Sequence, residues 1–293
     1  MSRPAAVSLL LRLVKRGASI FTVLIPTVAV IHSANVQAQS TTELTTKSTI
    51  DDPCGGTSSL LAILDRPTVG DSACVVPEKN VVLELGIQRV RYRDGSRGIN
   101  FPEAQFRFGM AGNNELVLLL PNYTRQTSGD VVTSGPGATV VGIKHGLGYT
   151  GKWLGAVESL VTIASGNSTF GSRGTGVAFN GIVSYSPTDD TSLSVMLGVT
   201  SQTLPRLAGG SRYTSVNPDF VGTWAMTERL QLYGEIYGQS RTGPGQGAGW
   251  NADGGVQYLF TPNVEVDVEV GSRLAGNLSG FSHYVGIGLG VKY

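Results

Sequence analysis

Three carboxylates alternate with four valines between Val264 and Gly271, so that Glu265, Asp267 and Glu269 share one face of an extended chain. Three acidic groups would disrupt the apolar core of a soluble β-sandwich. They suit a strand that separates lipid from a wet interior, because only one of its two faces is then apolar. Carboxylates that line such an interior attract cations. The pattern predicts a membrane-spanning strand with an acidic inner face.

The same alternation places further charged side chains on inward faces along the chain. Two interpretations stay open. In the first, Arg107 and Lys144 pair with carboxylates in a packed network that fills the interior. In the second, Glu265, Asp267 and Glu269 give a narrow pore a cation-favouring field. The lumen-facing candidates are Glu84, Arg107, Lys144, Glu158, Glu235, Asp253, Glu265, Asp267 and Glu269.

The N-terminus has the pattern of an export signal. A basic start is followed by an apolar stretch over residues 18–31 and by a small-residue cleavage signal, so that cleavage is expected near Ala38. Removing residues 1–38 leaves 18 basic against 21 acidic residues, a net charge of −3. This balance suggests no nucleic-acid partner. The expected location is the cell outer membrane of a Gram-negative bacterium.

The two cysteines, Cys54 and Cys74, are expected to form a disulfide, because an exported chain meets an oxidising compartment. Two cysteines without a nearby histidine cannot complete a zinc site. We therefore predict neither a metal site nor a cofactor.

The histidines are the residues that would suggest catalysis. Outer-membrane phospholipases use His, Ser and Asn near the barrel rim, and His145 lies on an outward face. No serine follows it at the spacing of those enzymes, since residue 147 is leucine. An isolated histidine at a strand end is usually structural, so no catalytic residue is predicted. A lipid-modifying enzyme stays as the second alternative function.

The elements that position these side chains are strands. Only 15% of the residues are charged, 40 are glycine, and mean hydropathy is +0.06. No apolar run long enough for a membrane helix follows the N-terminus. The period of two from residue 81 onward predicts an all-β, antiparallel up-and-down transmembrane barrel over residues 81–293. About twelve strands are expected, at residues 81–92, 101–110, 115–124, 138–147, 154–164, 175–185, 192–203, 213–225, 230–240, 250–260, 264–271 and 283–293.

Residues 39–80 form a separate periplasmic segment in this scheme. It consists of a flexible leader followed by the Cys54–Cys74 loop, with one or two helical turns between Ser58 and Leu64. Short turns alternate with longer loops, which places both chain ends on the periplasmic side. The segment would then cap or partly enter the barrel mouth.

The ends of the strands suggest contacts with lipid and with partner proteins. Aromatic residues near the short turns, and others such as Tyr92 and Phe281 near the long loops, predict two interfacial girdles. The final strand, which ends in Tyr293, is expected to engage the outer-membrane assembly machinery. Arginines bind phosphate bidentately. The candidates for contact with lipopolysaccharide phosphates are Arg93, Arg97, Arg125, Arg206, Arg212 and Arg241.

Two stretches carry a family resemblance. Asp65-Arg66-Pro67, Val76-Pro77 and the run from Val82 to Gly86 resemble the start of the MetA-pathway-of-phenol-degradation-like outer-membrane barrels. The C-terminal part, from Thr261 to the Gly-rich last strand, is also similar. The two cysteines depart from the commonest pattern of that family. The resemblance implies a transporter-like role with a link to aromatic compounds.

The leading prediction for function is passive or facilitated passage of small molecules, including hydrophobic or aromatic ones. The first alternative is a filled structural or surface-interaction barrel without transport. The identity of the solute is left open by the sequence.

Overall fold

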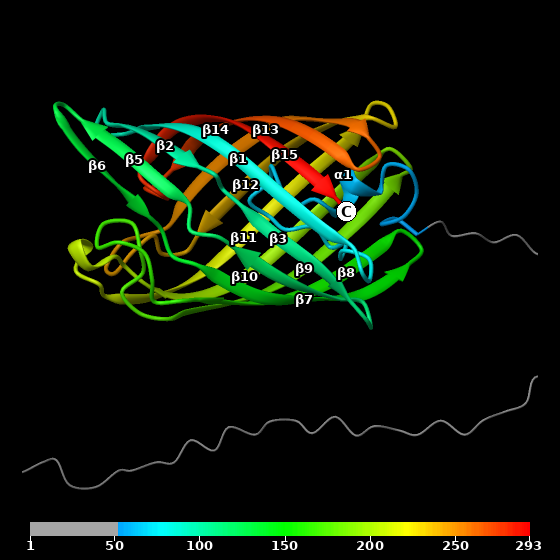
Figure 1. Ribbon diagram of the computed structural model, residues 1–293, viewed down its shortest axis with the longest axis horizontal. Helices are drawn as coiled ribbons and strands as arrows, with labels where there is room; N and C mark the ends of the chain where they lie inside the picture. The colour runs from blue at the N-terminus through cyan, green and yellow to red at the C-terminus, as the bar shows by residue number, and fades with distance from the viewer. Residues whose placement is uncertain (1–51) are drawn as a thin grey trace, which may run out of the picture. The chain divides into compact units, whose positions relative to one another are not determined.

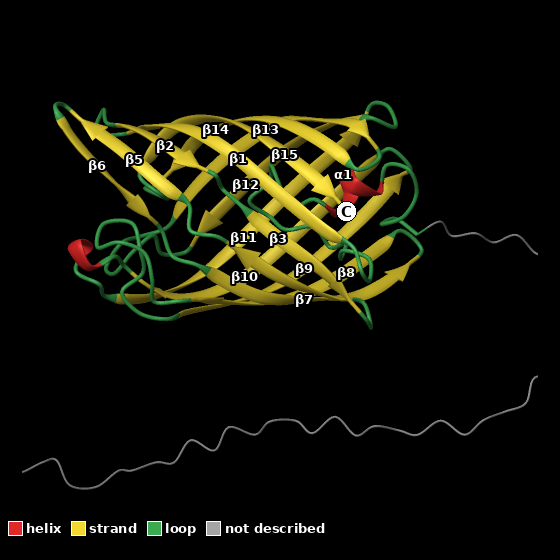
Figure 2. Ribbon diagram, in the orientation of Figure 1, coloured by secondary structure: helices red, strands yellow, loops and turns green. Residues whose placement is uncertain are grey.

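The computed structural model describes residues 52–293, which form a closed antiparallel β-barrel (Figures 1 and 2). Fifteen strand segments form one sheet, and strand β15 pairs with strand β1 to close it. Three pairs of segments each continue one wall strand, which gives the twelve strands that the sequence predicted. The predicted signal peptide, residues 1–38, and the leader up to residue 51 lie outside the described residues.

The barrel wall follows chain order. Its strands are β1 (Val81–Tyr92), β2 (Arg97–Phe101), β3 (Gln105–Met110), β4 (Asn114–Leu119), β5 (Tyr123–Ser128), β6 (Val131–Pro136), β7 (Val140–Thr150), β8 (Trp153–Thr162), β9 (Gly176–Thr188), β10 (Thr191–Thr203), β11 (Arg212–Ala225), β12 (Leu230–Gln239), β13 (Gly249–Thr261), β14 (Val264–Ala275) and β15 (Phe281–Lys292).

Three neighbouring wall strands are each broken into two pieces. Two of the breaks fall within the strands predicted at 101–110 and 115–124, and the third precedes β7, which corresponds to the strand predicted at 138–147 and is continuous. Pro102 separates β2 from β3, Pro121 separates β4 from β5, and Pro136 ends β6 before β7 begins. Proline has no N–H to donate to a ladder, so it interrupts pairing. The outer pieces β2, β5 and β6 pair with one another, and the free edge of β6 is met by a loop, where the N–H of Asn167 donates to the Pro136 carbonyl at 3.0 Å.

The inward and outward faces of β14 follow the predicted alternation. Val268 and Val270 are 50% and 58% exposed on the outer face, whereas Glu265, Asp267 and Glu269 are all buried. A soluble protein would show the reverse distribution, because a buried charge is costly and an exposed apolar side chain gains nothing from water. The outer face is therefore matched to lipid.

The aromatic residues follow the prediction near the short turns and in part near the long loops, where Tyr123 is 49% exposed. Near the short turns, the exposed Trp153 ring packs against the half-buried Tyr185 ring, with their centroids 4.6 Å apart. Near the long loops, Phe281 is buried and Tyr92 packs against the same interior cluster, so their predicted place in a second girdle is wrong. The register between β1 and β15 shifts at Tyr92, and this β-bulge turns Phe281 inward.

Residues 52–80, which we call the inner segment, enter the barrel (Figure 1). Its middle part, from Ser59 to Val76, lies inside, whereas residues near both of its ends are exposed. Helix α1 (Ser59–Ile63) confirms the predicted helical turns, and the disulfide between Cys54 and Cys74 confirms the predicted pairing. Leu60, Ile63 and Val76 of this segment are buried with the wall residues Val82 and Leu259. Within residues 52–293, no helix is long and apolar enough to cross a membrane.

Candidate functional site: the filled barrel interior

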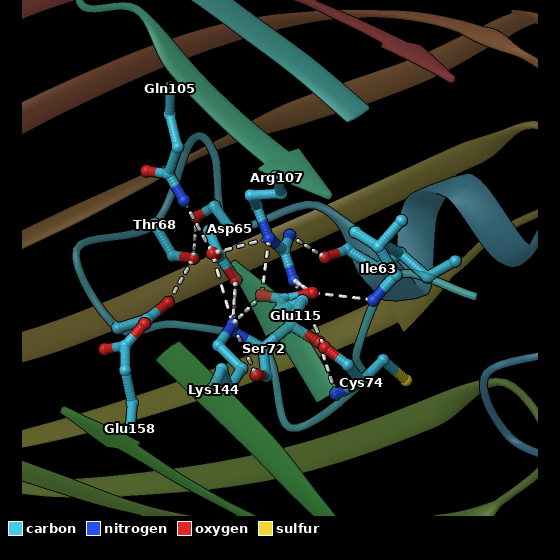
Figure 3. Close-up of polar contacts among 12 residues, drawn as sticks. Ile63, Asp65, Thr68, Ser72, Cys74, Gln105, Arg107, Glu115, Lys144 and Glu158 are labelled. Atoms are coloured by element: carbon cyan, nitrogen blue, oxygen red, sulfur yellow. Dashed lines mark hydrogen bonds and ion pairs between the residues drawn. The ribbon is translucent and has the colours of Figure 1, made fainter. Parts of the chain in front are cut away.

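Arg107 on β3 joins the barrel wall to the inner segment (Figure 3). Its guanidinium donates to Glu115 on β4 at 2.9 and 3.0 Å and to Glu84 on β1 at 3.2 Å. It also donates to two main-chain carbonyls of the inner segment, those of Ile63 and Cys74. The planar guanidinium has donors in several directions, so one side chain crosslinks two wall strands and the segment between them.

Asp65 of the inner segment receives three side-chain donors from two wall strands. The Lys144 Nζ on β7 lies 2.9 Å from its Oδ1, the Gln105 side chain on β3 donates to its Oδ2 at 2.8 Å, and the Arg107 Nε lies 3.2 Å from the same oxygen. The Ser72 N–H donates to Oδ1 at 2.9 Å. Burial opposes ionisation, but Arg107 and Lys144 outweigh it and hold the pKa of Asp65 below its usual value.

Arg66, the next residue, reaches the acidic face of β14. It donates to Asp267 at 3.4 Å, to Glu269 at 3.5 Å and to Glu103 at 3.1 Å. Its main-chain N–H donates to Glu84 at 2.7 Å. Burial favours the neutral form, but the three carboxylates prevail and raise the pKa of Arg66. The carboxylates of β14, which suggested a pore in the sequence, therefore bind the guanidinium of Arg66 from the same chain.

Glycines on the wall make room for Arg66. An added Cβ at Gly288 on β15 would lie 2.2 Å from the Asp267 Oδ2 and 2.6 Å from the Arg66 Nε. An added Cβ at Gly86 on β1 would lie 2.5 Å from the Arg66 Cζ. Real Cβ atoms do not approach neighbours this closely, so any larger residue would displace the guanidinium. The close approach of Arg66 and Asp267 thus explains sterically why the last strand has glycine at position 288.

Main-chain N–H groups of the inner segment are satisfied by wall carboxylates. Val69 and Gly70 donate to Glu235 on β12 at 2.9 and 2.7 Å, and Val76 donates to Glu115 at 2.6 Å. An irregular segment inside a barrel needs such acceptors, because buried N–H groups without partners are costly. Wall carboxylates consequently anchor the segment on several sides of the interior.

The other lumen-facing candidates lie on inward faces as well. Glu158 on β8 accepts from Asn180 at 2.9 Å, and Asp253 on β13 accepts from the Tyr284 hydroxyl at 2.6 Å. Glu265 has no exposed surface. The side chains of Arg107 and Lys144 are also fully buried, so the inner segment and the wall fill the part of the interior around them.

The arginines proposed for lipopolysaccharide lie on the outer loops and strand ends. All six are exposed, and Arg212 donates to the Thr175 carbonyl of a neighbouring loop at 2.5 Å. Their contact with lipid phosphates stays a prediction. Among residues 52–293, no three His, Cys, Asp or Glu residues are arranged to hold a metal ion.

Sequence reasoning did not assign roles to several residues of this interior. Asp65 and Arg66 were noticed only as part of a family motif, although a charged pair before a proline in a disulfide-closed segment is itself unusual. Glu115 and Asp219 were not chosen, although both lie on inward faces and alternation would have found them. The partners of these groups depend on the path of the inner segment, which alternation does not reveal.

Beyond the inner segment, toward the long loops, lies a cavity of about 520 Å³. Its floor is formed by Arg66 to Val69, and its walls include Asp219, Tyr237 and Phe281. The interior thus contains a part filled by the inner segment and a chamber beyond it.

Comparison with known proteins accords with this arrangement. Residues 64–289 match the model of the family described as "Putative MetA-pathway of phenol degradation". The chain belongs to this family. The match begins just before Asp65 and runs almost to the end of β15, so it includes most of the inner segment together with the barrel. The family resemblance of the sequence is confirmed.

Solved structures share the fold of this family member. The COG4313 outer membrane channel from Pseudomonas putida F1 is similar with a TM-score of 0.60 and 11% identity, over 77% of this chain and 100% of that one. The NanC porin is similar with a TM-score of 0.50 and 13% identity, over 73% and 100%. The KdgM porin has a TM-score of 0.50 and 10% identity, over 72% and 99%. No curated protein sequence matches the chain.

Proposed function

We propose that this family member is an outer-membrane channel through which small solutes pass, and that its interior favours cations over anions. The observation that carries the proposal is the charge balance inside the barrel. Among the described residues, the buried charged side chains are nine carboxylates and two cations, with Arg66 half-buried beside them. Fixed carboxylates in a low-dielectric interior lower the energy of a passing cation and raise that of an anion.

The similar solved structures are named a channel and porins, which supports passage of solutes at the level of the fold. The family description adds a link to phenol degradation, which supports aromatic molecules as one class of solute. Export and placement in the outer membrane agree with the signal pattern of residues 1–38.

A filled barrel without transport is the second candidate. It is favoured by the filled part of the interior around Arg107 and Lys144, where neither side chain has exposed surface. The two candidates differ in whether the refolded protein makes a membrane permeable.

A lipid-modifying enzyme finds less support. His145 is exposed on the outer face and its Nδ1 lies 2.9 Å from the Asn114 Oδ1. Within residues 52–293, no serine or threonine hydroxyl is hydrogen-bonded to His145, so a nucleophile is not in place beside it. Phospholipid hydrolysis that is lost on His145→Ala would support this candidate against the proposal.

Flux into proteoliposomes tests the proposal. The full mature chain, refolded into vesicles, is expected to admit a small cationic solute faster than an anionic solute of the same size. Empty vesicles, and vesicles holding an unrelated closed barrel, serve as controls. Equal entry into protein-containing and empty vesicles for every solute would reject the channel and leave the filled barrel.

A further inference from the structure

The chamber beyond the inner segment has walls of two kinds. One wall is aromatic and apolar, with Val90, Tyr237, Phe281 and Tyr284 buried in one cluster to which Tyr92 adds. The Phe281 and Tyr284 rings meet edge to face at a centroid distance of 5.1 Å. A volume of about 520 Å³ is in the range of pockets that hold small organic molecules. The size and this wall therefore suit a solute with an aromatic or apolar part.

The second feature of the chamber is Asp219 on β11. This side chain lines the cavity, is only 2% exposed, and neither carboxylate oxygen receives a hydrogen bond from an N–H or a hydroxyl group among the described residues; its polar neighbour is the Glu235 carboxyl group. An added Cβ at Gly70 would lie 2.9 Å from its Cγ, so the carboxylate packs against the main chain of the inner segment. A buried carboxylate without a partner is costly, and a ligand that supplies the missing charge removes this cost.

The neighbours of Asp219 do not supply a cation. The nearest acidic groups are Glu235 on β12, which already receives the N–H groups of Val69 and Gly70, and Asp253 on β13, which receives the Tyr284 hydroxyl. Their presence adds negative charge to the same side of the chamber.

Arg66 is the cation in the floor of the chamber, and its ion pairs are with Glu103, Asp267 and Glu269. Within residues 52–293, no Lys, Arg or His side-chain nitrogen lies within 4.0 Å of an Asp219 carboxylate oxygen, so Asp219 forms no ion pair there.

We propose that the chamber is a binding site for a small organic ammonium ion, with its nitrogen at Asp219 and its apolar part against Tyr237, Phe281 and Tyr284. The carboxylate accepts charge-assisted hydrogen bonds from the ammonium group. Aromatic faces attract a cation and bury the hydrocarbon beside it. This inference rests on the proposed function, because it names the class of solute that the channel would select.

Benzylammonium is the probe, and benzyl alcohol is its neutral match in size and shape. Isothermal titration of the full mature chain in detergent is expected to give saturable binding of benzylammonium and no measurable binding of benzyl alcohol at the same concentrations. Asp219→Asn is expected to weaken benzylammonium binding by about tenfold or more, the loss typical of a charged hydrogen bond. Asp130→Asn, which removes the same charge from an exposed turn, serves as the matched control and is expected to bind as the wild type does.

Several results would overturn the inference. Equal affinity for benzylammonium and benzyl alcohol, no binding of benzylammonium, or unchanged binding by Asp219→Asn would each reject the site. The comparison of the two probes needs no variant, so it decides the matter even where Asp219→Asn does not refold.

Failure of the site and failure of the channel are separable. Specific benzylammonium binding without flux of any solute into proteoliposomes keeps the site and rejects the proposed function. Flux of small solutes without benzylammonium binding keeps the channel and rejects the site.

Discussion

The Nζ of Lys144, in the barrel wall, lies 2.9 Å from the Oδ1 of Asp65, in the inner segment, and both side chains are buried. A salt bridge of this kind is formed only when the segment occupies the interior, so it reports directly on that state. Removal of one partner from a buried pair leaves an uncompensated charge and costs about 3–5 kcal/mol.

Lys144→Met is therefore expected to loosen the inner segment. Hydrogen exchange of the main-chain N–H groups of residues 63–76 should become faster by several orders of magnitude, whereas exchange in the wall strands should change little. Lys152→Met, which removes an exposed lysine from a turn, is the control. The pairing would lose its assigned role if both variants exchanged alike, or if the effects of Asp65→Asn and Lys144→Met on exchange were fully additive in the double variant.

Asp71, in the inner segment, is expected to destabilise the folded segment near neutral pH, whereas Asp65 stabilises it. Burial, followed by the nearby carboxylates Glu158 and Asp65, raises the pKa of Asp71 well above 3.8. Its contribution to stability is thus fully present below pH 3.8 and is lost as pH rises through the raised pKa. Asp71→Asn should slow exchange of the inner segment near neutral pH and change nothing in acid. A variant that destabilised the segment near neutral pH would contradict this sign.

The lowered pKa of Asp65 gives a second pH expectation. A group whose pKa is lowered in the folded state contributes stability above its ordinary pKa of 3.8, and this contribution is lost as pH falls through the lowered value. In a background of Asp71→Asn, the inner segment should remain protected from exchange down to pH 3.8. Loss of protection well above that pH would show that Asp65 does not hold the segment.

The disulfide between Cys54 and Cys74 closes a loop with a sequence separation of 20. Loop closure of this length stabilises by about 3 kcal/mol, because it restricts the unfolded segment. Cys54→Ser with Cys74→Ser should increase protease cleavage within residues 54–74 and leave the barrel intact on a gel. Reduction of the wild type should give the same cleavage. Identical cleavage of oxidised and reduced protein would show that the loop is held by its other contacts alone.

Gly288 tests the fit between the wall and Arg66. Gly288→Ala places a methyl group 2.2 Å from the Asp267 carboxylate and 2.6 Å from the guanidinium, and overpacking of this kind costs about 1–3 kcal/mol. Gly234→Ala is the matched control, because nothing lies within 4 Å of its added Cβ. The free energy of urea unfolding in detergent should fall for the first variant and not for the second. Equal values would remove the steric role given to Gly288.

The sequence predicted the barrel because, in a membrane strand, apolar residues that face lipid alternate with polar residues that face the interior. Val264 to Glu269 gave the inner and outer faces of β14 directly, and the disulfide followed from export and a single cysteine pair. Prolines in three neighbouring strands were not weighed against the alternation, so the breaks at Pro102 and Pro121 were missed. The bulge at Tyr92 reversed the face of Phe281, since one inserted residue shifts a period of two.

The interior was harder to predict for a physical reason. The alternation of polar and apolar residues predicts that Glu84 and Lys144 point inward, but it does not predict which groups they contact there. Their partners come from an irregular segment without periodicity, so Asp65 and Arg66 gained their roles only from the folded path. Of the two interpretations left open, the packed network matches the level of Arg107, and the chamber beside Asp219 lies beyond it.

The central claim, that the interior favours cations over anions, is tested most directly by the reversal potential of the full mature chain in a planar bilayer under a KCl gradient. This potential depends on the permeability of the channel to potassium relative to chloride. The account predicts a potential of the sign set by potassium, which moves toward zero in Asp219→Asn and not in Asp130→Asn. A potential of the sign set by chloride, or a membrane that carries no current with the protein inserted, would contradict it.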